Sequence, residues 1–186
     1  TIAESAVVMA IVFTLGCLAS MFSLKVKYDS QISDLKNSSP LSSSTTGRID
    51  YNELKIGNII KLTNSYRKKE GLQNYTENEQ LNLAAKQKAE DMVNNNYFAH
   101  TAPSGTTGWD FIKRNNYVYD HAGENLAVTN ESAFSVVDGW YNSETHRANL
   151  LSSVYAEVGI GIAYKGSYEG NKGVTFIVAL YGDPYP

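Results

Sequence analysis

The sequence predicts an α+β or layered α/β/α domain behind a long hydrophobic helix at the N-terminus. Two observations lead to this class. Segments with helical apolar spacing come first in the domain, and two strand-like runs come last. Ahead of them stands an uninterrupted apolar segment, followed by a Ser/Thr-rich stretch. The chain has 186 residues, which suits one ordinary domain with an appendage.

The apolar segment from Ser5 to Leu24 contains no charged residue. A helix of this length spans about 30 Å, the thickness of a bilayer core. A cleavable signal peptide fits poorly, because acidic Glu4 precedes the segment and basic Lys25 and Lys27 follow it. We therefore expect a helix over residues 1–36 that is retained in the mature chain, with Thr1 as a processed or trimmed end.

This N-terminus resembles that of type IV pilin-like subunits, in which an acid near the fifth position precedes an apolar helix. The resemblance implies that copies of the chain pack through these helices into a filament core. Glu4 stands one position early for that pattern. A simple membrane anchor with a helix-capping glutamate is the alternative, and both remain open.

A Ser/Thr-rich spacer over residues 37–47 separates this helix from the domain. Its core, SSPLSSSTTG, is too polar to pack and suits a flexible linker. We place the domain at residues 48–186.

Two longer helices open the domain. Apolar residues recur at helical spacing from Tyr51 to Lys69, and Gly71 ends that helix. Thr76 and Glu79 match a capping box and predict the start of the second helix.

Shorter elements complete the domain. Helices are expected around Trp109–Arg114 and Ser132–Asn142, with Trp109 and Trp140 in the core. The β-branched runs VGIGIAYK and VTFIVALYG flank the turn-prone GSYEGNKG, which predicts an antiparallel hairpin.

Composition excludes some classes of function. A formal net charge of −3 provides no basic surface for a phosphate backbone, so we expect no nucleic-acid partner. The single cysteine, Cys17, cannot form an intrachain disulfide, so packing alone must hold the domain together.

Three polar clusters lie in otherwise apolar contexts, and together they hold the three histidines of the chain: NNYFAHTAPSG, DHAGENLAV and WYNSETHRANLL. Imidazoles and carboxylates gathered from separate segments are typical of metal and proton-transfer sites. Capping or loop hydrogen bonds would explain each residue equally well. No two histidines stand four apart, so no helical zinc motif is present.

The motifs FAHT, GENLA, W-x-x-S-x-x-H-R-x-N-L-L and VGIG resemble, in this order, the CAP superfamily of cysteine-rich secretory proteins, antigen 5 and pathogenesis-related proteins in its prokaryotic form. The resemblance covers nearly all of residues 52–182. It implies a three-layer α/β/α sandwich with a central cleft, where two histidines and one or two glutamates can hold a divalent cation such as zinc or calcium.

Carried over by position, the resemblance assigns His100, Glu124 and His146 to that cleft. Glu144 is the nearest candidate for a second glutamate, but it stands one position beyond the expected place. His121 matches no family ligand, and we expect it to be exposed. The polar residues Asn125, Arg147 and Asn149 are expected to tie loops to the backbone.

These features predict an extracellular, surface-displayed domain that acts as a filament subunit with an adhesion or ligand-binding role. The alternative is a membrane-anchored protein that binds a divalent cation, lipid or glycan. A metal-dependent hydrolase with Glu124 as base ranks lower, because there is no GxSxG motif and the cysteine is remote. We expect no catalytic residues.

Overall fold

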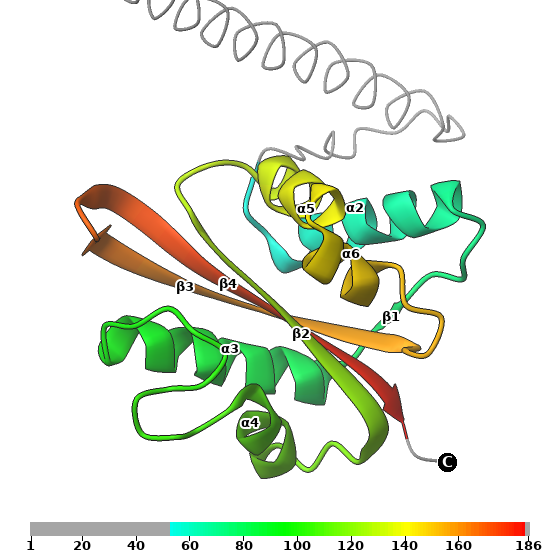
Figure 1. Ribbon diagram of the computed structural model, residues 1–186, viewed down its shortest axis with the longest axis horizontal. Helices are drawn as coiled ribbons and strands as arrows, with labels where there is room; N and C mark the ends of the chain where they lie inside the picture. The colour runs from blue at the N-terminus through cyan, green and yellow to red at the C-terminus, as the bar shows by residue number, and fades with distance from the viewer. Residues whose placement is uncertain (1–52, 185–186) are drawn as a thin grey trace, which may run out of the picture. The chain divides into compact units, whose positions relative to one another are not determined.

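The computed structural model describes residues 53–184, which fold as helices on both faces of one sheet (Figure 1). The elements in chain order are α2 (Ile56–Lys69), β1 (Thr76–Glu77), α3 (Glu79–Asn94), α4 (Gly108–Arg114), β2 (Tyr119–Thr129), α5 (Ala133–Asn142), α6 (Glu144–Leu150), β3 (Glu157–Tyr168) and β4 (Asn171–Pro184). The predicted hydrophobic helix, the spacer and their boundaries lie outside these residues and stay predictions. From residue 53 to 184, no helix has the length and apolar character needed to cross a membrane.

The sheet has four strands in the order β1-β3-β4-β2. The strands β3 and β4 form the predicted hairpin, in antiparallel register from Glu157↔Gly182 to Tyr168↔Asn171. The strand β2 pairs antiparallel with β4, and the two-residue β1 pairs parallel with β3. The α+β class is confirmed, with a sheet that contains both parallel and antiparallel pairs.

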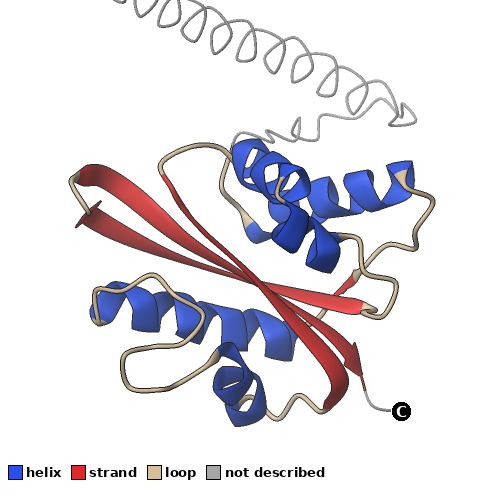
Figure 2. Ribbon diagram, viewed as in Figure 1, coloured by secondary structure: helices blue, strands red, loops and turns tan. Residues whose placement is uncertain are grey.

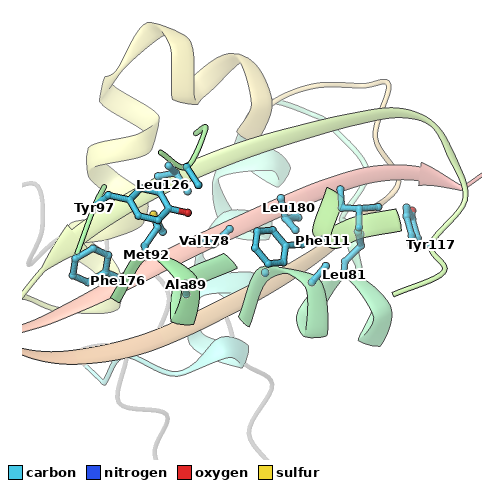
Figure 3. Packing of buried hydrophobic residues seen from close by; sticks show 14 of the residues in the cluster. Leu81, Ala89, Met92, Tyr97, Phe111, Tyr117, Leu126, Phe176, Val178 and Leu180 are labelled. Carbon is cyan, nitrogen blue, oxygen red and sulfur yellow. The ribbon is translucent and has the colours of Figure 1, made fainter. Parts of the chain in front are cut away.

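Helices α3 and α4 lie on one face of the sheet, and α2, α5 and α6 lie on the other (Figure 2). The main core lies between α3 and the sheet, where apolar side chains from both elements interlock (Figure 3). Leu81, Ala85 and Met92 of α3 are fully buried there. This layering fixes where the ends of β2 and the neighbouring loops meet.

The predicted capping box at Thr76 is wrong. Thr76 and Glu77 are extended and pair with β3. The cap of α3 is Asn78, whose side chain accepts a hydrogen bond from the Leu81 amide at 3.1 Å. Because the backbone of Thr76 pairs with β3 in parallel, the helix starts two residues later than the sequence pattern suggests.

We expect Asn78→Ala to lower the free energy of unfolding by about 1 kcal/mol, because an orphan helix amide loses its acceptor. Thr76→Ala is the matched control and should cost much less, since Thr76 does not cap the helix. Urea unfolding of the two variants compares them. Equal losses would show that Asn78 is not the cap.

Two further predictions need correction. The first helix begins at Ile56 rather than Tyr51, because Lys55 is extended and serves as its N-cap. Trp140 is buried as expected, but Trp109 is 41% exposed. The GENLAV segment, to which the sequence analysis assigned no element, belongs to strand β2.

Candidate functional site

The structure brings His100, Glu124 and His146 to one cleft of about 340 Å³. His100 lies in the loop after α3, Glu124 on β2 and His146 on α6. Because β2 is the last strand of the sheet order, the cleft sits at an edge of the sheet where both helical layers reach it. Its other lining residues include Thr101, Thr107, Gly108, Trp109, Asn125, Thr145 and Asn149.

His100 and Glu124 form a direct pair. The His100 Nδ1 atom and the Glu124 Oε1 atom are 2.5 Å apart. The Glu124 side chain is only 4% exposed, whereas that of His100 is 64% exposed. Burial raises the pKa of Glu124, while the hydrogen bond from His100 and the charge of Lys88 act in the opposite direction. An ionised Glu124 only accepts, so Nδ1 then donates the shared proton, and Nε2 of a neutral His100 imidazole keeps its lone pair.

The second oxygen of Glu124, Oε2, is buried and has no hydrogen-bond partner among the described residues. It lies against Gly108, the first residue of α4. A Cβ atom at Gly108 would stand 2.4 Å from Oε2. Glycine at this position therefore makes room for the buried carboxylate.

Gly108→Ala should displace the Glu124 carboxylate and lower the free energy of unfolding by about 1 to 3 kcal/mol, because the site has no space for a methyl group. The matched control is Gly139→Ala in α5, where a Cβ would meet no atom within 4 Å. That change should stabilise the domain, by up to about 1 kcal/mol. Thermal unfolding measures both, and a neutral Gly108→Ala would contradict the tight fit.

Like His100, His146 is held through its Nδ1 atom, in this case by a residue of its own segment. Its Nδ1 lies 2.8 Å from the Ser143 Oγ atom, one turn back along the chain. Burial lowers the pKa of His146, and the nearby His100 lowers it further. Both cleft histidines are thus engaged through Nδ1, so both have Nε2 left for a ligand.

The polar residues expected to be structural do fix the cleft. Asn125 is fully buried and donates to the His146 carbonyl at 3.0 Å. Asn149 donates to the Glu124 carbonyl and to the Asn125 side chain, each at 3.0 Å. Arg147 donates to the Tyr141 carbonyl at 3.2 Å. Together, Asn125 and Asn149 tie α6 to β2 and so place His146 opposite His100.

The other two candidates lie elsewhere. Glu144 is exposed in the first turn of α6 and is not among the residues that line the cleft. His121 is exposed on β2, as expected. Sequence reasoning missed Trp109 as a cleft residue, because its apolar character suggested the core.

The side chains at the cleft can be compared with the ligands that the implied divalent cation would need. Within residues 53–184, no three His, Cys, Asp or Glu side chains are grouped closely enough to hold a metal ion. The two Nε2 atoms fit as ligands, because metal-bound histidines typically give their other nitrogen to a carboxylate or similar partner. Glu124 is arranged as the partner of His100 in this way. A cation in the cleft would therefore be held by His100 and His146, and solvent or a ligand would complete its coordination.

Comparison with known proteins gives a consistent result. Residues 60–181 match the family model described as CAP, the cysteine-rich secretory protein family. The Bacillus subtilis protein YkwD is 37% identical over 109 residues, which cover 59% of this chain and 42% of YkwD. The chain thus spans less than half of that relative.

Two solved structures are similar in fold and sequence. One is an extracellular protein with an SCP domain from Bacillus anthracis, with a TM-score of 0.60 and 27% identity over 74% of this chain and 45% of that one. The other is an outer surface protein of Borrelia burgdorferi, with a TM-score of 0.56 and 25% identity over 68% of this chain and 90% of that one. The family model and the shared fold lead to one conclusion: the chain belongs to the CAP family, in a bacterial-type form with extracellular and surface relatives.

Proposed function

We propose that the chain is a surface-displayed binding module whose ligand site is the cleft between His100 and His146. One observation carries the proposal. Two imidazoles from separate segments face one cleft, and each is held through Nδ1 so that Nε2 stays available. Such convergence of oriented polar groups in a concave site is typical of a binding site.

The ligand that best suits these two nitrogens is a divalent transition metal ion, or a polar molecule held through one. Imidazole suits zinc, whereas calcium prefers oxygen ligands, so zinc is favoured over calcium. His100 and His146 would hold the ion, and Glu124 would keep His100 oriented. When bound, the ion would supply a Lewis-acid position for an oxygen atom of the ligand.

Calorimetry of the full chain in detergent with zinc chloride tests this proposal. We expect binding at one site, and we expect His100→Ala and His146→Ala each to weaken it by at least about tenfold because each removes a ligand. His121→Ala is the matched control and should bind as the wild type does, since His121 lies outside the cleft lining. Absence of zinc binding, or equal losses in all three variants, would contradict the proposal.

We also propose that the hydrophobic segment at residues 5–24 displays the domain, as the core of a filament through which copies of the chain assemble. The charge-free length of the segment and the acid ahead of it support this. Negative-stain images of the cell surface should show fibres that disappear when the gene is deleted. Smooth cells with the protein in the membrane fraction would favour a simple anchor instead.

A further inference from the structure

Lys88 is a fully buried lysine behind the cleft. It lies on α3 among apolar neighbours and is 0% exposed. Its Nζ atom donates to the Tyr97 hydroxyl at 3.1 Å and to the His100 carbonyl at 3.0 Å. Lysine is among the residue types that are almost never fully buried without a partner, so its position calls for an explanation.

Among the described residues, no acidic side chain forms an ion pair with the ammonium group of Lys88. Burial lowers the pKa of Lys88, and the more distant charges of Glu124 and Asp91 act against that shift. A buried cation satisfied mainly by a hydroxyl and a carbonyl costs stability compared with an apolar side chain. A gain in the stability of the domain therefore does not explain why a lysine stands at this position.

The contacts of Lys88 lie on the segment that carries His100. Tyr97 and His100 both belong to the loop between α3 and α4. The Tyr97 hydroxyl in turn donates to the Asp91 carboxylate, back on α3. The loop is thus fixed to α3 at two points, one of which is the backbone of His100 itself.

We propose that Lys88 is the positioning residue of the cleft: together with Tyr97 it holds the backbone of His100 where the imidazole meets Glu124. The pair of contacts, called here the Lys88 brace, fixes the loop at Tyr97 and at His100. With the brace in place, His100 keeps its Nδ1 on Glu124 although its side chain is largely exposed. The role of the brace in ligand binding rests on the proposed function. The effect of the brace on the position of His100 does not depend on that function.

A general structural role would have different consequences. If Lys88 only joined a loop to a helix, its loss would lower stability but leave the hydrogen bond between His100 and Glu124 in place. A direct spectroscopic signal of that bond separates the two roles. The Nδ1 proton of an imidazole bonded to a carboxylate at this distance is expected to resonate at low field and to exchange slowly with water.

The test is proton NMR of the full chain in detergent, comparing the wild type with Lys88→Met. The low-field resonance is assigned to His100 by its absence in His100→Ala. We expect Lys88→Met to abolish or broaden this resonance and to weaken zinc binding by about tenfold, as losses of orienting partners do. An unchanged resonance in folded Lys88→Met would overturn the proposal.

Arg67→Met is the matched control. Arg67 is also a buried cation, 2% exposed, and it ties other segments through the carbonyls of Gln73, Leu150 and Ser152. This variant should lose stability yet keep the His100 resonance. Loss of the resonance in Arg67→Met as well would show that general destabilisation is the cause and would also overturn the proposal.

Tyr97→Phe keeps the test decisive if Lys88→Met does not fold. It removes one contact of the brace while keeping the aromatic ring, and the His100 resonance should shift. An unchanged signal would again contradict the brace. Because the resonance is read without zinc, a wild type that binds no zinc would refute the proposed function and leave the brace testable.

Discussion

Gly161→Ala is expected to prevent stable folding of the domain. A Cβ atom at Gly161 would lie 2.0 Å from the Ala85 carbonyl carbon and 2.2 Å from the Lys86 amide nitrogen. These are backbone atoms of α3, so no side-chain rotation can relieve the overlap. The helix would have to move off the sheet and open the main core, at a cost of about 4 kcal/mol or more, which approaches the whole stability of a small domain.

The matched control is Gly166→Ala on the same strand, where a Cβ would meet no atom within 4 Å. It should unfold as the wild type does. Circular dichroism with urea titration measures both variants. An ordinary point mutation lowers the free energy of unfolding by about 1 kcal/mol. If Gly161→Ala lowered it by no more than this, the contact between α3 and β3 would be wrong.

Asn125→Leu is expected to lower the free energy of unfolding by about 3 kcal/mol, because it leaves buried polar partners unpaired. Asn125 donates to the His146 carbonyl and to the Tyr181 hydroxyl, and it accepts from Asn149. Leucine has similar volume but none of these bonds. The segment that carries His146 would then be free to shift away from His100.

Two measurements on Asn125→Leu check this expectation. Urea titration should show the lower free energy of unfolding. Zinc affinity should fall, because His146 is no longer held in place. Asn130→Leu, at an exposed position just beyond the same strand, is the control and should change neither. A folded Asn125→Leu with wild-type zinc affinity would show that Asn125 does not position His146.

Most of the fold was predictable, because apolar spacing and β-branched runs report burial directly. The hairpin of β3 and β4 is such a case. The strand β2 was not, because Glu124 and Asn125 interrupt its apolar pattern. Their side chains are buried and form tertiary contacts with His100, His146 and Asn149, which a local pattern does not contain. The start of α3 was predicted two residues too early for a similar reason, because the backbone at Thr76 pairs with β3.

Part of the cleft was also predictable. The family resemblance assigned His100, Glu124 and His146, and the structure places all three in the cleft lining. The resemblance could not reveal the exposed Trp109 or the buried Lys88. A signal for Lys88 was present, however. It stands four residues from both Ala84 and Met92, on the buried face of α3, where a lysine is unexpected.

His100 and His146 are proposed to form one binding site through their Nε2 atoms. X-ray diffraction from zinc-soaked crystals of the protein, with data collected across the zinc absorption edge, tests this proposal. We predict an anomalous peak in the cleft within bonding distance, about 2.0 to 2.1 Å, of both Nε2 atoms, with the His100 Nδ1 still on Glu124. An empty cleft, or zinc bound only at His121 or another surface position, would contradict the proposal.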